Sequence, residues 1–373
     1  MNRFDFRFAL KTSLLLSAFI ASIFELTTCA MPPTAIQQSE QDVDPVQAMA
    51  LTAKAFRSAV KKIRPQLVTI ESFGGVSAVQ GRIGGIRSQG EGNTTGLLIS
   101  KEGHIVTSTF NFIQSPPVIT VITGDGQRRV AKMLGKDEIR KLCVLKIAPY
   151  DAIESPTFAT TDSLQVGQWA ISVGVGYGDV NPAMSCGIIS AKNRIGGRAI
   201  QTDANISPAN YGGPLLDITG NVIGICVPLN PQQQSIGAGV EWYDSGIGFA
   251  VPLSGTDQFL ERLKNGDNIY PAFLGVRTQP NPAGDGLRIS EVVVDSPAKK
   301  AKLSHADVIL KINDSKVDDL QGLRKILYGF EAGQTIKLQY QRDDQEPKTI
   351  EVTLAPIPPP KDAPPQLEPP KIR

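Results

Sequence analysis

The residues best able to do chemistry gather in the run Asn210-Tyr211-Gly212-Gly213-Pro214. Two glycines before a proline favour a tight turn, and backbone N–H groups in such a turn can face a developing negative charge. The only hydroxyl in the run belongs to Tyr211. A phenol, whose ordinary pKa is about 10, stays protonated at neutral pH unless a base lies beside it. The run therefore predicts a structured turn without an activated nucleophile.

Other candidate nucleophiles and bases are isolated. The chain has two histidines, His104 and His305, which we interpret as ordinary surface or turn residues. Ser207 and Cys186 are near Tyr211 in sequence, but a lone serine or cysteine without a partner is usually structural.

Three cysteines follow residue 30, namely Cys143, Cys186 and Cys226, and each lies in an apolar stretch. Their separations fit neither a zinc site nor a disulfide framework, which favours small buried hydrophobic side chains. A Cys186–Cys226 bridge stays open. We expect no metal and no cofactor.

Composition restricts the functional classes. The 373 residues suffice for two domains, each with its own core. A formal charge of +2, without a basic stripe carrying aromatics, gives no reason to expect nucleic-acid binding. The cluster Lys299, Lys300 and Lys302 is interpreted as solvated surface.

The first thirty residues resemble an export signal. Arg3, Arg7 and Lys11 precede the apolar run Leu14 to Phe24, and Thr28-Cys29-Ala30 offers small residues for cleavage after Ala30. We expect an exported, periplasmic or extracytoplasmic protein. An uncleaved N-terminal membrane anchor and lipidation of Cys29 stay open. Residues 31–50 are polar and contain proline, which indicates a flexible lead-in.

The turn that holds Tyr211 must be positioned by short strands. After an expected helix over 48–63 and a strand over 67–71, apolar runs alternate with Gly- and Asp-containing turns. These runs form two sets, over 96–147 and 169–252, and a helix over 254–264 follows. Two sets of this kind predict a pair of barrels with the working cleft between them.

A different pattern begins after residue 267. Strands are expected over 273–276, 286–294, 307–312, 335–341 and 349–354, with a short helix opened by Ser296-Pro297-Ala298 and another over 320–328. The tail, residues 357–373, is rich in proline and cannot continue a sheet or helix.

The chain resembles the HtrA/Deg family, in which a trypsin-like domain precedes a PDZ domain. The phrases that carry the resemblance run from Gln201 to Asp217, from Gly103 to Phe112, from Asp137 to Ile147 and from Ser296 to Asn313. The resemblance implies a mainly β fold, with a trypsin-like double barrel over 51–265 and a PDZ domain over 268–356.

The resemblance also implies that the catalytic triad is lost. The histidine of the family falls on Phe110, its aspartate on Lys141 and its serine on Tyr211. Serine proteases need a hydroxyl, an imidazole and a carboxylate acting together. We therefore expect no catalytic residues and a pseudoprotease. The alternative is an active serine-type hydrolase with an unrecognised nucleophile.

Two remnants of binding function are expected. The oxyanion loop would retain Asn210, Gly212 and Gly213, with Ala209 in place of the family's glycine. Similarity to PDZ domains places a peptide-binding loop at Phe273, Leu274, Gly275 and Val276, where a peptide C-terminus would add as a strand.

The partners that the resemblance implies are unfolded proteins or peptide C-termini. HtrA proteins are typically trimers built through the region before the first strand, here around Phe56. A homotrimer, or a mixed oligomer with active relatives in which this chain is a regulatory subunit, is therefore expected. A pseudoprotease could also act as a scaffold or as a chaperone-like binder.

Overall fold

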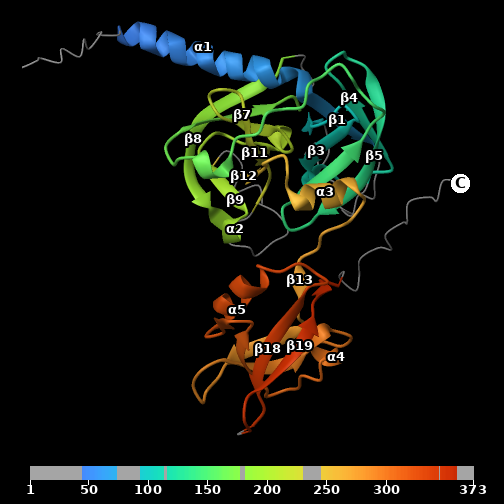
Figure 1. Ribbon diagram of the computed structural model, residues 1–373, viewed down its shortest axis with the longest axis vertical. Helices are drawn as coiled ribbons and strands as arrows, with labels where there is room; N and C mark the ends of the chain where they lie inside the picture. The colour runs from blue at the N-terminus through green and yellow to red at the C-terminus, as the bar shows by residue number, and fades with distance from the viewer. Residues whose placement is uncertain are drawn as a thin grey trace, which may run out of the picture. The chain divides into compact units, whose positions relative to one another are not determined.

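A computed structural model describes residues 44–73, 93–112, 116–176, 181–229, 245–343 and 345–358. Two closed six-stranded barrels and a separate C-terminal sheet make up a mainly β fold, as predicted (Figure 1). The expected signal segment and Cys29 lie outside the described residues, as do most of the lead-in and nearly all of the proline-rich tail. Among the residues that the structure describes, no helix has both the length and the apolar character to cross a bilayer.

The first barrel closes in the strand order β1-β2-β3-β6-β5-β4, and every neighbouring pair is antiparallel. Val106 and Leu145, from adjacent strands, are fully buried. The six strands are β1 (Leu67–Phe73), β2 (Thr94–Leu98), β3 (His104–Ser108), β4 (Val118–Ile122), β5 (Arg128–Asp137) and β6 (Leu142–Lys146).

The second barrel closes in the order β10-β11-β12-β9-β8-β7. One continuous core cluster contains Val106 and Val144 of the first barrel together with Val173 and Val251 of the second. The two barrels therefore share an apolar interface. The strands are β7 (Trp169–Gly174), β8 (Ala183–Asn193), β9 (Ala199–Thr202), β10 (Pro214–Leu216), β11 (Val222–Cys226) and β12 (Gly248–Pro252).

The C-terminal sheet has the order β14-β15-β16-β18-β19, so β14 is an edge strand. In β18 the residues Ile336, Leu338 and Tyr340 alternate with exposed or half-buried ones, as expected for a strand with one face on a core. The strands are β14 (Val276–Pro280), β15 (Leu287–Val292), β16 (Val308–Ile312), β17 (Ser315–Lys316), β18 (Thr335–Gln341) and β19 (Lys348–Thr353), and β13 (Ala272–Phe273) pairs separately with β20 (Ala355–Pro356).

Helices are few in this fold. The α-helices are α1 (Pro45–Ile63), α2 (Arg194–Gly197), α3 (Gln258–Lys264), α4 (Pro297–Lys300) and α5 (Leu320–Leu327), and the 3₁₀ turns are η1 (Arg64–Gln66), η2 (Thr109–Phe112), η3 (Thr161–Ser163) and η4 (Pro208–Asn210). The helix expected over 254–264 begins later, at Gln258. Its first residues form a turn instead, because Gly255 has φ +80° and the N–H of Ser254 donates to Asp257 Oδ2 at 2.8 Å.

The cysteine predictions are only partly correct. Cys143 and Cys226 are buried, as expected, but Cys186 is exposed. It lies in β8, where neighbouring residues point to opposite faces, so an apolar neighbourhood in sequence does not imply burial. All three thiols are free, so the Cys186–Cys226 bridge is absent from this structure.

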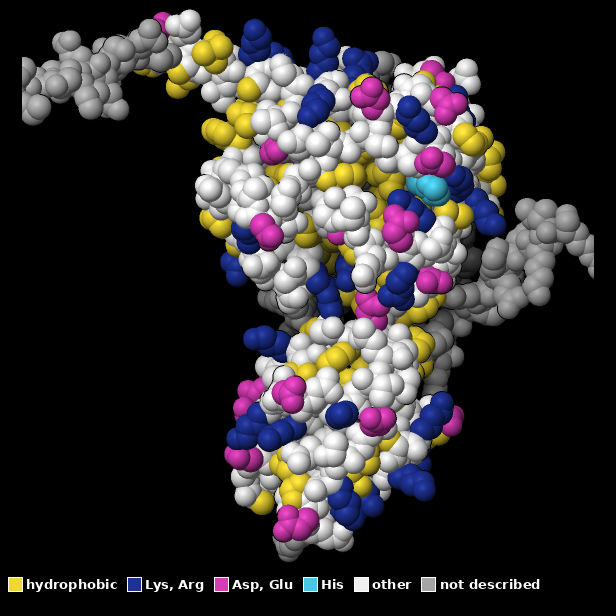
Figure 2. Space-filling view, in the orientation of Figure 1, with side chains coloured by type: hydrophobic (Ala, Val, Ile, Leu, Met, Phe, Trp, Pro, Cys, Tyr) yellow, Lys and Arg dark blue, Asp and Glu magenta, His cyan; other side chains and the backbone are white. Residues whose placement is uncertain are grey.

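Surface charge is mixed. Lys and Arg side chains are interspersed with Asp and Glu side chains over the face that Figure 2 shows. An intermixed surface of this kind differs from the basic stripe of a nucleic-acid-binding face.

Candidate functional site

The loop between β9 and β10 carries Tyr211 and is held by hydrogen bonds from β2 of the first barrel. The hydroxyl of Thr94 donates to Tyr211 O at 2.9 Å, and that of Thr95 donates to Ala209 O at 2.8 Å. Gly212 has φ +88°, and a Cβ placed there would lie 2.1 Å from Thr107 Oγ1. Only glycine fits this position, so the loop keeps one conformation against the first barrel.

Backbone N–H groups in this loop are turned inward. Asn210 N donates to Ser207 O at 2.9 Å, and Tyr211 N donates to Pro208 O at 3.3 Å. Gly212 N donates to Cys226 O at 2.8 Å, and Gly213 N donates to Asn210 O at 2.9 Å. An oxyanion site needs N–H groups that point together at the position of the substrate's oxyanion. These four groups are instead satisfied by carbonyl oxygens of the chain itself.

Tyr211 and Phe110 pack against each other. Their ring centroids are 5.1 Å apart with planes at 69°, an edge-to-face pair. The side chains are 4 % and 7 % exposed and belong to the same core cluster as Ile189 and Leu215. Burial of a large apolar side chain stabilises a fold by about 1.5–3 kcal/mol, and an aromatic pair adds about 0.5–1.5 kcal/mol. The two rings therefore act as core at this site.

Lys141 lies beside this pair through its backbone. Its carbonyl oxygen accepts the N–H of Thr109 at 2.9 Å, next to Phe110, while its Nζ lies 3.4 Å from Glu138 Oε2. Burial lowers the pKa of the Lys141 ammonium, and the charge of Glu138 opposes that shift. The structure thus brings positions 110 and 211 into contact and places the backbone of 141 next to them.

The carboxylate of Asp137, where β5 ends, is not available to this pair. Asp137 is fully buried and accepts the N–H groups of Ile139 and Arg140 at 2.8 and 2.9 Å, while Arg140 Nη1 lies 2.6 Å from its other oxygen. Its oxygens are committed to holding the turn.

A serine and a histidine do meet elsewhere. Ser100 Oγ lies 2.9 Å from His104 Nδ1 in the turn between β2 and β3. Burial, and then the charge of Lys146, lower the pKa of His104, which disfavours the charged imidazole. However, Gly103 N donates to Ser100 O at 3.0 Å within the same turn. This nearby backbone N–H is therefore not free to stabilise an oxyanion. His305, by contrast, is exposed.

The buried thiols are poor nucleophiles. Burial raises the pKa of Cys226 to about 12, so its thiolate is not populated near neutral pH. Burial also raises the pKa of the Cys143 thiol. Within the described ranges, no three His, Cys, Asp or Glu side chains come together as a metal site.

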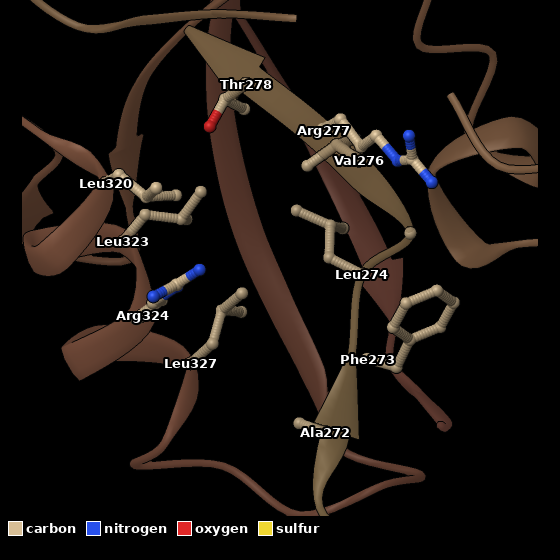
Figure 3. A pocket seen from close by; sticks show the side chains of 11 residues that line it. Ala272, Phe273, Leu274, Val276, Arg277, Thr278, Leu320, Leu323, Arg324 and Leu327 are labelled. Carbon is tan, nitrogen blue, oxygen red and sulfur yellow. The ribbon is translucent and has the colours of Figure 1, made fainter. Parts of the chain in front are cut away.

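A groove of about 320 Å³ lies between the edge strand β14 and helix α5 (Figure 3). Leu274 is buried at its base, and Gly275 has φ +85°. A Cβ at position 275 would lie 2.1 Å from the Cβ of Ser296, so only glycine fits there. The carbonyl groups of Leu274 and Gly275 accept the N–H groups of Ala298 and Val293, both at 2.9 Å. These bonds fix the loop that leads into β14.

Both walls of the groove are visible in Figure 3. Leu274 and Val276 lie on the β14 side, and the ring of Phe273 points to the side of the strand away from α5. The wall formed by α5 was not predicted from the sequence as part of a site. Its spacing is a usable signal, because positions i, i+3, i+4 and i+7 of a helix share one face. The residues at these positions are Leu320, Leu323, Arg324 and Leu327.

Comparison with known protein families identifies the same two regions, the pair of barrels and the C-terminal sheet. Residues 94–225 match the trypsin-like peptidase domain model, and residues 272–354 match the PDZ domain model. A serine protease Do-like HtrA of Lactococcus lactis subsp. cremoris is 30% identical over 330 residues, which are 77% of this chain and 79% of that protein. The chain belongs to the HtrA/Deg family.

Further relatives agree with this assignment. A probable periplasmic serine endoprotease DegP-like of Chlamydia trachomatis is 35% identical over 71% of this chain and 54% of its own length. The chain thus spans about half the length of the first curated relatives that it matches. The solved structure of the HtrA-type protease AlgW with a decapeptide is 25% identical, covers 82% of this chain and 99% of its own, and has a TM-score of 0.60.

Proposed function

We propose that this HtrA/Deg-family chain does not cleave peptides and instead binds them through its PDZ domain. The observation that carries the proposal is the buried contact between Phe110 and Tyr211. The resemblance predicts that these are the positions of the family's imidazole and nucleophile. Two rings in core packing leave neither a proton acceptor nor the space in which a scissile carbonyl could lie.

The backbone of the Tyr211 loop supports the same proposal. A protease that loses its triad retains some rate over water through its oxyanion site and substrate binding. Here the N–H groups of Asn210, Tyr211, Gly212 and Gly213 all donate within the protein. Loss of the triad costs on the order of 10⁶-fold in turnover, and the inward-turned donors give no compensating stabilisation.

Peptide binding is proposed at the groove between β14 and α5. An edge strand offers unpaired backbone groups to an added strand. Gly275, whose missing Cβ makes room for Ser296, keeps the loop before this strand in one conformation. The groove's apolar base, formed by Leu274 and Val276, suits an apolar last side chain. Unfolded proteins and exposed C-termini are the partners that we propose.

Location and assembly extend this proposal. We place the protein outside the cytoplasm, in the periplasm or another extracytoplasmic compartment, after cleavage of a signal peptide over residues 1–30. We retain 51–265 and 268–356 as the two domains. We further propose a homotrimer or a mixed oligomer with active relatives, built around Phe56. Its ring centroid is 5.2 Å from that of Trp169, which is 46 % exposed.

The second candidate function is a hydrolase that uses an unaligned nucleophile. Among the hydroxyl and thiol groups described above, Ser100 is the best candidate for that nucleophile, because it contacts His104. The two candidates are separated by turnover of an unfolded substrate and by peptide binding measured on the same preparation. A Ser100→Ala variant distinguishes catalysis at that pair from contamination. A non-cleaving binder shows no turnover above this variant and binds peptides that end in a free carboxylate.

A further inference from the structure

The peptide groove contains a hydroxyl that has no hydrogen-bond partner in the described part of the chain. Thr278 Oγ1 is buried and makes no hydrogen bond with the described residues. Figure 3 shows this oxygen on the side of β14 that faces α5. A buried polar atom left unpaired costs about 1–3 kcal/mol. A ligand atom that accepts from Thr278, or donates to it, would remove this cost.

A cation that has no counter-ion among the described residues lies in the same groove. Arg324 projects from α5 toward β14 (Figure 3), is exposed, and makes no ion pair with another described residue. None of the described residues that line the groove is acidic. The other lining cation, Arg277, differs because its Nη1 lies 3.3 Å from Glu291 Oε2. The groove therefore presents one unpaired positive charge to a ligand.

Strand geometry indicates which peptide residue meets these groups. A peptide that adds antiparallel to β14, with its carboxylate at the Gly275 loop, directs alternate side chains toward α5. Its last side chain then lies near Leu274. Its third side chain from the end lies near Thr278 and Leu320, at the other end of the groove (Figure 3). Arg324 lies on α5 between Leu320 and Leu327.

We propose that the groove selects peptides with an apolar last residue and an acidic third residue from the end. The side-chain carboxylate accepts a hydrogen bond from Thr278 Oγ1 and pairs with Arg324. The aliphatic stem of that acidic residue contacts Leu320. This inference rests on the proposed capture of peptide C-termini and adds the class of peptide that is captured.

Fluorescence anisotropy with the full chain tests the inference. Three labelled decapeptides differ only at the third residue from the end, which is Glu, Gln or Lys, and all end in Ala-Val. We expect the Glu peptide to bind about three- to tenfold more tightly than the Gln peptide, and the Lys peptide to bind most weakly. An Arg324→Gln variant should abolish the preference for Glu over Gln. A Thr278→Val variant should reduce it.

A matched control removes a charge from the same helix. Lys325 is exposed and does not line the groove, so Lys325→Gln should leave the preference unchanged. Amidation of the C-terminus tests the proposed function separately, because it removes the terminal carboxylate and keeps the acidic side chain.

Three outcomes are distinguishable. A preference for Glu that is lost in Arg324→Gln and kept in Lys325→Gln supports the inference. Equal affinity for the Glu, Gln and Lys peptides, with binding still abolished by amidation, overturns the inference and leaves the proposed function standing. Failure of all three peptides to bind, or indifference to amidation, overturns C-terminal capture and the inference with it.

Discussion

The ring of Tyr211 lies edge-to-face against that of Phe110, with centroids 5.1 Å apart, and both side chains are nearly fully buried. Phe110 comes from η2 of the first barrel, while most of the cluster around it comes from the second. Under our proposed assignment of these two positions to the family's imidazole and nucleophile, a contact for proton transfer is replaced by one that joins two barrels. This relationship makes the stability of the fold, rather than turnover, the property that mutation of Tyr211 should change.

Truncation of Tyr211 should destabilise the protein. We expect Tyr211→Ala to lower the free energy of unfolding by about 3–5 kcal/mol, because it removes a buried ring and leaves a cavity beside Phe110. Tyr211→Phe keeps the ring and should cost about 1 kcal/mol. Urea denaturation of both variants measures the difference. Equal stability of Tyr211→Ala and the parent chain would mean that the ring is not part of the core.

Two glycines with similar backbone angles should respond differently to alanine. Gly212 (φ +88°) has Thr107 Oγ1 2.1 Å from the position of a Cβ, whereas Gly126 (φ +77°) has nothing within 4 Å. Left-handed strain alone costs about 1–2 kcal/mol, which both variants bear. Gly212→Ala should cost more because the loop must also move. Thermal unfolding of the two variants compares them, and equal losses would contradict the crowding described here.

The pair between buried Asp307 and partly exposed Arg342 should matter more than a pair in which both side chains are exposed. Asp307 is 1 % exposed and is held by Arg342 Nε and Nη2 at 2.7 and 2.8 Å. Arg342→Ala removes the charged partner of that buried carboxylate, which keeps the N–H of Ser304 at 2.8 Å, and should cost about 1–3 kcal/mol. Arg277→Ala, which breaks an exposed pair with Glu291, should cost at most about 1 kcal/mol. Chemical denaturation, monitored by a probe in the C-terminal sheet, compares the stability losses of the two variants.

His104 should make the first barrel sensitive to acid. Burial and Lys146 lower its pKa in the folded state below the ordinary value, so the unfolded chain binds the proton more readily. This histidine's contribution is therefore present above the unfolded pKa and is lost as the pH falls through the folded pKa. Between pH 7.5 and pH 5, the parent chain should lose more stability than His104→Gln does.

The matched control for this pH dependence is His305, which is exposed. A His305→Gln variant should lose as much stability on acidification as the parent chain. If His104→Gln and the parent chain show the same pH dependence of their unfolding midpoints, His104 is not the group responsible.

The barrels could be predicted from sequence because short apolar runs end at strong turn residues. Gly103 and Gly126, for example, both adopt positive φ in turns that the sequence marks as hairpins. The kink in α2 could not be predicted, since Ile195 has φ +52°, a conformation that a β-branched residue rarely adopts. Exposure of Cys186 was missed because burial along a strand depends on which face a residue occupies.

The sequence predicts some residues of each candidate site but not the contacts between distant segments. Position 211 stands out in sequence because the resemblance predicts a nucleophile there and the chain carries a phenol, but contact with Phe110 requires two segments about a hundred residues apart to meet. The loop at Gly275 is local and could be named from its residues. Its opposite wall, including Arg324, comes from a separate helix, and only the folded structure brings the two together. The assignment of 110, 141 and 211 to the triad positions stays a prediction.

Cleavage of an unfolded casein substrate by the purified protein tests the central claim most directly. Tyr211→Phe and Ser100→Ala variants and an active HtrA-type protease run beside it under the same conditions. We predict that the active relative degrades the substrate while this protein shows no turnover above either variant. Turnover that Tyr211→Phe or Ser100→Ala abolishes would contradict the account, because it would mean that one of these hydroxyls takes part in catalysis.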